Sequence, residues 1–91
     1  MALEIKVKKP TEGELKEKGI KGWPIWEKEI STFDWSYDSE ETCYFLDGAV
    51  TVTPKGGAPV SFGKGDLVVF PKGMKCVWDI KQPVRKHYHF A

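Results

Sequence analysis

Apolar and polar residues alternate along several short stretches of this chain, and turn-forming residues separate the stretches. Alternation with a period of two is typical of half-buried strands, whose successive side chains point to opposite faces. The first stretch carries lysines on its polar face, which is typical of an edge strand. The pattern predicts strands over Leu3–Val7, Thr32–Tyr37, Thr42–Leu46, Ala49–Thr53, Val60–Phe62, Leu67–Phe70, Lys75–Ile80 and Val84–Phe90.

Glycine and proline mark the ends of these predicted strands. Asp47–Gly48 is a strong hairpin signal, so we expect a turn there between two strands. Pro83 lacks an amide hydrogen, so we expect a break at Gln82–Pro83. Short strands with closely spaced turns and little helix predict an all-β antiparallel sandwich or barrel, with about eight to ten strands.

One short helix is expected near the N-terminus. Thr11 and Glu14 have the spacing of a capping box, and Gly19 can end a helix over Glu12–Lys18. Leu15 is the one apolar residue of this segment, so the helix should lie on the surface. The following segment, Trp23–Trp26, has three interpretations: a lid over one end of the barrel, a dimer contact, or one wall of a ligand pocket.

The stretch Glu41–Gly48 combines unusual residues on one face. Glu41, Cys43 and Phe45 lie two apart, so in a strand they point the same way. A carboxylate and a thiol beside an aromatic ring are an unusual exposed surface, so we expect this face to line the barrel interior. The alternating face of Lys75–Ile80, which carries Cys76 and Trp78, should share that interior.

The register of the last strand decides which ionisable groups face Glu41. One face of this strand carries Val84, Lys86, Tyr88 and Phe90. Its apolar residues favour this face as the buried one, and Lys86 would then pair with Glu41, because a buried carboxylate needs a partner. A shift of one residue would instead bring His87 and His89 inside with Glu41 and Cys76, a plausible set of four metal ligands.

Composition and charge limit the classes of binding partner and the cellular location that we expect. The chain has 14 basic and 13 acidic residues, a net charge of +1, which argues against nucleic-acid binding. No apolar run is long enough to span a membrane, and Met1–Lys9 has no apolar signal core. Two cysteines are too few for a disulfide framework, so we expect free thiols and a cytoplasmic location, although a longer precursor stays open. A small core and the apolar groups of Trp23–Trp26 favour a homodimer.

The glycine and proline skeleton of two stretches resembles the two cupin motifs. Glu41–Gly48 has the spacing of the second half of the first motif, and Gly65–Cys76, with Pro71 and Gly73, has that of the second. Together with the final strand Pro83–Tyr88, they resemble the small single-domain cupins grouped with ureidoglycine aminohydrolase (the cupin 3 type). The resemblance implies one domain over residues 1–91 with an antiparallel, jelly-roll-like barrel.

In metal-binding cupins three histidines and one glutamate hold a divalent ion, which is manganese in the related hydrolase. The resemblance places these positions at Trp35, Tyr37, Glu41 and Cys76. Only the glutamate is kept, and a tryptophan cannot ligate. We therefore expect no resident metal or other cofactor.

We predict that the interior binds a small polar organic molecule, with or without converting it. Glu41, Lys86 and Cys76 are the candidate catalytic residues, with Cys76 as a thiol that a nearby lysine activates. The candidate ligand-binding residues are Trp35, Tyr37, Cys43, Trp78 and Tyr88. Two alternatives are a metal-dependent aminohydrolase related to ureidoglycine breakdown and a non-catalytic interaction module. The same residues also have purely structural interpretations: inert buried thiols, a stabilising carboxylate and core tryptophans.

Overall fold

The computed structural model describes residues 4–90 of the chain. Its elements are β1 (Lys6–Lys8), α1 (Glu12–Lys18), the 3-10 helix η1 (Ile20–Gly22), β2 (Ile25–Lys28), β3 (Ser31–Ser36), β4 (Glu41–Pro54), β5 (Val60–Gly63), β6 (Leu67–Phe70) and β7 (Lys75–Phe90). The expected all-β antiparallel fold with one short N-terminal helix is confirmed. Leu3, part of the first predicted strand, lies outside the described residues.

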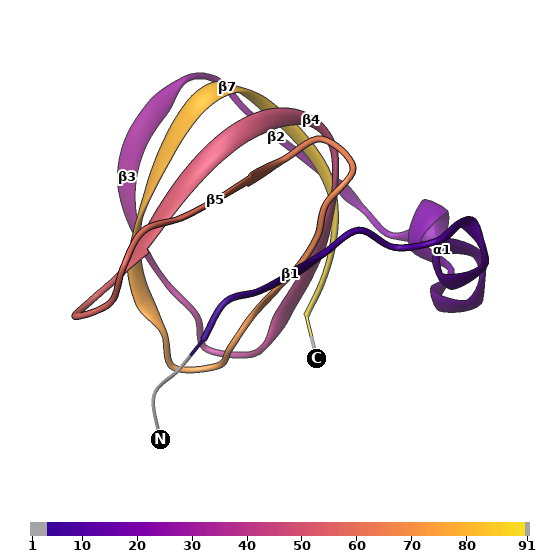
Figure 1. Ribbon diagram of the computed structural model, residues 1–91, viewed down its shortest axis with the longest axis horizontal. Coiled ribbons are helices and arrows are strands. Elements are labelled where there is room, and N and C mark those ends of the chain that lie inside the picture. Colours follow the sequence, from indigo (N-terminus) through magenta and orange to yellow (C-terminus); the bar gives the residue numbers. More distant parts are fainter. Residues whose placement is uncertain (1–3, 91) are drawn as a thin grey trace.

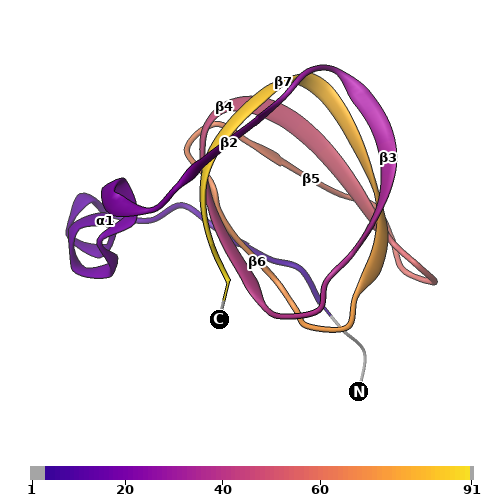
Figure 2. The ribbon, with the colours of Figure 1, turned by 180° about the vertical axis from the view of Figure 1, so that it is seen from behind.

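Two long strands, β4 and β7, organise the sheet. They pair with each other along most of their length. On its other edge, β4 pairs with β6 at its start and with β5 at its end, whereas β7 pairs with β3 at its start and with β2 towards its end. β1 adds to the free side of β6. The strands curve around one interior, as Figure 1 and the reverse view in Figure 2 show.

The predicted hairpin at Asp47–Gly48 is wrong, and so is the predicted break at Gln82–Pro83. Each position lies within one continuous strand, β4 or β7, and the pairing register between the two strands shifts there. Gly48 has φ +116°, and a Cβ on it would lie 2.9 Å from the carbonyl oxygen of Pro83. The glycine and the proline are therefore opposite sides of one bulge, which bends both strands. Seven strands result among residues 4–90, fewer than expected.

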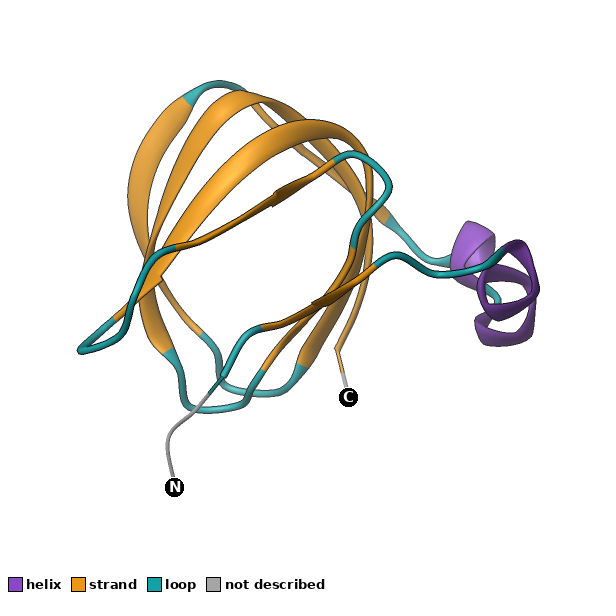
Figure 3. Cartoon of the chain, in the orientation of Figure 1, coloured by secondary structure: helices purple, strands orange, loops and turns teal. Residues whose placement is uncertain are grey.

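The capping box of α1 is confirmed. The Thr11 side chain accepts a hydrogen bond from the Glu14 amide, and Gly19 ends the helix in the left-handed conformation with φ 64°. The helix lies outside the barrel, as Figure 3 shows. Its Leu15 is nevertheless buried, because it packs with Ile20 and Leu67 against the outer face of the sheet. Neither α1 nor η1 is long and apolar enough to cross a membrane.

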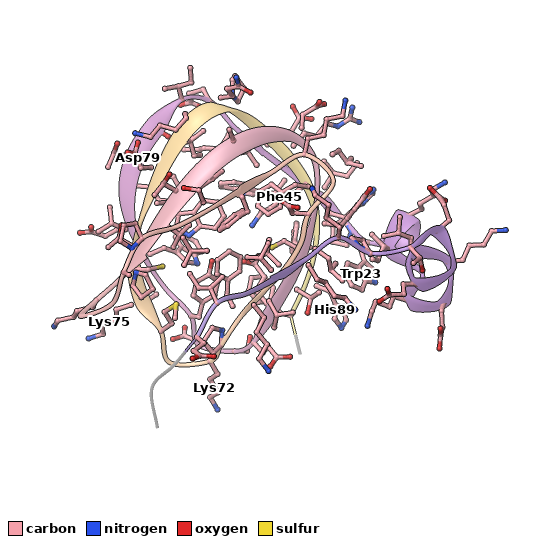
Figure 4. The ribbon with its side chains drawn as sticks, in the orientation of Figure 1. Trp23, Phe45, Lys72, Lys75, Asp79 and His89 are labelled. Atoms are coloured by element: carbon pink, nitrogen blue, oxygen red, sulfur yellow. The ribbon has the colours of Figure 1, made fainter. Side chains whose placement is uncertain are left out.

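Apolar side chains fill the barrel interior, where Figure 4 places Phe45. The buried members of this inner cluster are Tyr37, Cys43, Phe45, Val50, Val52, Phe62, Val68, Phe70, Met74, Cys76, Trp78, Ile80 and Val84. Most come from inward positions on strands, as the alternation predicts, whereas Tyr37 follows β3 and Met74 precedes β7. Val7, expected on a buried face, is 40% exposed because β1 is an edge strand.

Candidate functional site

A buried ion pair between β4 and β7 is the centre of the candidate site. Cα of Lys86 lies opposite Phe45, and the side chain extends past Cys43 to Glu41, which begins β4. The expected inward register of the last strand is confirmed, because both Val84 and Lys86 are buried in the interior. The expected pairing of Glu41 with Lys86 is also confirmed.

The Lys86 ammonium has two polar neighbours. Its Nζ lies 3.4 Å from Oε2 and 3.5 Å from Oε1 of Glu41, and 3.2 Å from Sγ of Cys43. The side chains of Lys86 and Glu41 are 5% and 6% exposed. The two distances to the carboxylate are longer than those of tight charge-assisted hydrogen bonds, so the carboxylate retains capacity to accept from another donor.

Aromatic rings surround the same ammonium group. Its Nζ lies 4.7 Å from the ring centroid of Trp78 and 4.9 Å from that of Trp26. The rings of Phe45 and Phe70 follow at 5.8 and 6.0 Å. Cation–π attraction therefore adds to the ion pair in offsetting the cost of burying a charge.

A cavity of about 170 Å³ adjoins the ion pair. Its wall is mostly aromatic, and its charged groups are those of the ion pair. The lining residues are Trp26, Phe33, Trp35, Tyr37, Glu41, Trp78, Lys86, Tyr88 and Phe90. Six of them were candidate site residues from the sequence, and they come from β3, β4 and β7 and the turn after β3.

Two buried polar atoms at this wall make no hydrogen bond within the described residues. They are the hydroxyl oxygen of Tyr37 and Nε1 of Trp78. Burial raises the pKa of Tyr37 far above its ordinary value, and the nearby Glu41 carboxylate raises it further. The nearby Trp78 indole lowers the pKa of the Tyr37 phenol slightly. The two groups nevertheless do not meet the geometry of a hydrogen bond. The phenol is therefore protonated, and each of the two buried groups keeps an unused hydrogen-bond donor.

The two thiols do not behave as the sequence suggested. Cys43, rather than Cys76, contacts the Lys86 ammonium. Burial raises the pKa of Cys76 to about 11, and Sγ of Cys76 faces the carbonyl oxygen of Trp35 at 3.7 Å. The expected activation of Cys76 by a lysine is therefore wrong. Burial also raises the pKa of Cys43 strongly, despite the lowering effect of Lys86. Both cysteines are free, and neither lines the cavity.

The histidines of β7 lie on the outer face, so the alternative register is excluded. Nδ1 of His87 is 2.9 Å from the carbonyl oxygen of Trp23. His87 is only 7% exposed, because η1 and the segment after it cover it, a burial that the sequence did not indicate. The His89 ring stacks on Trp23 with centroids 5.1 Å apart, and Figure 4 shows this pair beside the helices.

The four cupin ligand positions hold an unusual set of groups here. Trp35 and Tyr37 lie on the cavity wall, Glu41 is paired with Lys86, and Cys76 carries a protonated thiol. Within residues 4–90, no three His, Cys, Asp or Glu side chains gather closely enough to hold a metal ion.

Three residues of the cavity wall were absent from the candidate residues. Trp26 pairs directly with Lys86 across β2 and β7, so the pocket-wall interpretation of Trp23–Trp26 holds for this tryptophan. Phe33 shares the inward face of β3 with Trp35, a signal that the alternation already contained. Phe90 lies opposite Glu41, at the end of β7.

Comparison with known proteins identifies a solved structure and a curated protein that are similar to this chain. A crystal structure of a DUF861 family protein from Thermotoga maritima matches with a TM-score of 0.95 and 55% identity, covering 97% of this chain and 100% of that one. The Clostridioides difficile protein named acetate kinase EutQ is 31% identical over 74 residues, which are 81% of this chain and 46% of that protein. The chain thus spans about half the length of this curated relative.

Structures of EutQ proteins resemble the barrel as well. That of C. difficile EutQ gives a TM-score of 0.65 at 26% identity, covering 96% of this chain and 67% of that one. A putative ethanolamine utilization protein EutQ from Salmonella typhimurium gives 0.63 at 23% identity, covering 70% and 51%. The family model of the EutQ-like cupin domain (Cupin_3) matches residues 15–88. The chain therefore belongs to the EutQ-like cupin domain family.

Proposed function

We propose that this cupin binds a small organic molecule, with a flat apolar body and one polar group, in the cavity beside Glu41 and Lys86. The observation that carries the proposal is the buried Lys86–Glu41 pair on the wall of an aromatic cavity. A buried ion pair is weak evidence of stability, because apolar residues of similar volume often stabilise a core at least as well. Its position at a concave aromatic surface instead favours a role in binding.

The size and chemistry of the cavity support a single-ring ligand or a short chain. A cavity of about 150 Å³ with apolar walls can hold benzene, and this one measures about 170 Å³. Trp26, Phe33 and Trp35 offer ring faces and edges for stacking. A larger cofactor or nucleotide would not fit inside without rearrangement of this wall.

The polar groups of the wall favour an acceptor, such as a carboxylate or amide oxygen. Lys86 already occupies the ring faces and the carboxylate that would otherwise attract a cationic ligand. Among the described residues, neither the Tyr37 hydroxyl nor the Trp78 indole N–H has a hydrogen-bond partner. Leaving such a group unsatisfied costs about 1–3 kcal/mol, and a ligand oxygen that reached them would recover part of that cost.

We also propose that binding needs no resident metal. Of the four cupin ligand positions, Trp35 cannot ligate, burial keeps the Tyr37 phenol and the Cys76 thiol protonated, and Glu41 is engaged by an ammonium group. This donor set does not fit Mn²⁺ or Zn²⁺, which need several deprotonated ligands. The alternative of a metal-dependent aminohydrolase related to ureidoglycine breakdown is disfavoured for the same reason.

Ligand screening by thermal unfolding tests the proposal. The panel contains single-ring and short-chain carboxylates, amides and alcohols, with acetate included because of the name of the C. difficile relative. We expect at least one member to stabilise the protein, by about 2.7 kcal/mol at a hundredfold excess over its Kd. A panel without any stabilising member would overturn the proposal.

Two substitutions of exposed residues, which the fold should tolerate, test whether the ligand binds in this cavity. Trp35 is 47% exposed and lines the cavity, so Trp35→Ala should fold and weaken binding by about tenfold. Ile30 is 62% exposed and lies outside the cavity, so Ile30→Ala is the matched control and should bind normally. Equal affinities in both variants would place the ligand elsewhere. Elemental analysis of the untagged protein tests the proposal that binding needs no resident metal. Detection of stoichiometric Mn, Fe, Ni or Zn would contradict it.

A further inference from the structure

Lys86 combines three properties that bear on the reactivity of its amine. Its side chain lines a cavity, aromatic rings rather than water surround its amine, and a carboxylate lies within reach of the amine's proton. A lysine amine that is withdrawn from water in an apolar pocket is the arrangement from which Schiff bases form with carbonyl compounds.

We propose that Nζ of Lys86 reacts with a small apolar aldehyde in the cavity to form an imine. This proposal rests on the proposed function, because the aldehyde must first occupy the same cavity. It adds a covalent step and a substrate class: aldehydes no larger than a single aromatic ring.

Glu41 supplies the proton transfers of the step. The ammonium gives one proton to the Glu41 carboxylate, 3.4 Å away, and the neutral amine attacks the carbonyl carbon. The C–N bond forms as the carbonyl π bond opens, and the oxygen takes the proton that the attacking nitrogen releases, which gives a neutral carbinolamine while Glu41 keeps its proton. Loss of that oxygen as water, with the Glu41 proton, leaves a protonated imine. One water is released, and no electrons are gained or lost.

The surroundings of Lys86 suit the product as well as the starting amine. A protonated imine keeps the single positive charge of the ammonium, so the ion pair with Glu41 remains. Its planar cation can lie against Trp26 and Trp78, whose centroids are 4.9 and 4.7 Å from Nζ. The apolar wall also excludes the water that would hydrolyse the imine.

The neighbouring thiol is a poor competitor for the aldehyde. Cys43 is fully buried behind Lys86, outside the cavity lining, and burial raises its pKa strongly. Because the thiolate is the nucleophilic form, the amine is the reactive group that the cavity presents.

Reductive trapping tests the step on the wild-type protein. The protein is treated with benzaldehyde and cyanoborohydride, whose hydride reduces an imine to a stable secondary amine. Peptide mapping by mass spectrometry then compares Lys86 with exposed lysines such as Lys72 and Lys75, which point away from the barrel in Figure 4. We expect Lys86 to be labelled at least about tenfold faster, since proximity and acid–base help act only there.

Benzyl alcohol separates the failure of this step from the failure of binding. It has the same ring but no carbonyl, so it should bind reversibly and slow the labelling of Lys86. If benzyl alcohol binds while label appears only on exposed lysines, the imine proposal is wrong and the binding proposal stands. If neither compound occupies the cavity and Lys86 stays unlabelled, both are wrong for this ligand class.

Two variants sharpen the result. Lys86→Arg keeps the charge but cannot form an imine, so its total labelling should fall by one adduct per chain relative to the wild type, and an unchanged total would place the reactive amine on another lysine. Glu41→Gln should slow labelling by about a hundredfold if the carboxylate moves the proton. An unchanged labelling rate in a folded Glu41→Gln protein would remove Glu41 from the step.

Discussion

Lys86 and His87 are neighbours on β7, and both are buried, but different parts of the molecule cover them. Lys86 points into the barrel, where strand residues from β4 and β2 surround it. His87 points outwards, where the segment between α1 and β2 covers it and the carbonyl oxygen of Trp23 meets its ring. The inner site consists of a charged pair, aromatic rings and a cavity, whereas the outer site consists of a neutral backbone contact and a small apolar cluster.

The difference shows that burial has two sources in a small barrel. The inner face of a strand is buried by the closure of the sheet itself, and the alternation of the sequence reports it directly. The outer face is buried only where another segment happens to pack, as α1 and η1 do here with Leu15 and Ile20. The free-energy cost of burying a charge therefore differs between the inner and the outer face of the sheet. Variants on each face can test the two costs separately.

Breaking the inner pair should have the largest effect. Lys86→Met leaves the Glu41 carboxylate buried without a partner, so we expect a loss of about 3–5 kcal/mol in the free energy of unfolding, measured with urea. The double variant Lys86→Met/Glu41→Gln removes both charges and should recover most of that loss. A single variant that unfolds within about 1 kcal/mol of the wild type would show that the pair is not buried as described.

Truncation of a side chain in the apolar cluster outside the barrel should have the next largest effect on stability. Ile20 is 1% exposed and packs with Leu15 and Leu67, so Ile20→Ala should cost about 3 kcal/mol. The exposed Ile30 provides a control, whose change to alanine should stay within about 0.5 kcal/mol. The prediction fails if the two alanine variants unfold at the same urea concentration.

Alkaline pH should weaken the fold through Cys76. Its folded-state pKa of about 11 lies above the ordinary value of 9.0, so the protonated thiol stabilises the protein fully below pH 9. That contribution is lost as the pH rises through about 11 and amounts to roughly 3 kcal/mol. Cys76→Ala should lower stability at every pH but show a correspondingly flatter loss between pH 9 and 11. Parallel pH profiles for both proteins would contradict this assignment.

The helix cap should give the smallest effect and leave the inner site intact. Thr11→Ala removes the side-chain hydrogen bond to the Glu14 amide and should cost about 1 kcal/mol. Thr11→Ser keeps the oxygen and should remain close to the wild type. Because α1 packs outside the barrel, the affinity of the cavity for a ligand should not change in either variant. A changed affinity would show that the outer and inner faces are coupled.

Much of the fold could be read from local patterns. The cap of α1 depends on residues three apart, and β6 coincides with the predicted Leu67–Phe70, since both signals are contained in a few neighbouring residues. The Asp47–Gly48 prediction failed because a glycine with positive φ serves a bulge as well as a hairpin. The choice depended on Pro83, which is distant in sequence but opposite in space.

The candidate site divides in the same way. Alternation correctly placed Glu41, Lys86 and Trp78 in the barrel interior. Because a buried carboxylate needs a partner, it also indicated the ion pair. The predicted activation of Cys76 was wrong and the burial of His87 was not indicated, because each depends on which neighbour a side chain meets. No local pattern gives that information for groups more than 40 residues apart.

The sequence by itself determined which residues face the interior, because a strand alternates its side chains whatever the rest of the chain does. Only the tertiary structure decided that Lys86 reaches past Cys43 to Glu41, that Trp26 closes over its ammonium group, and that a cavity remains beside them. Those features depend on the relative shift of β4, β7 and β2. Pairing between strands that are distant in sequence fixes that shift.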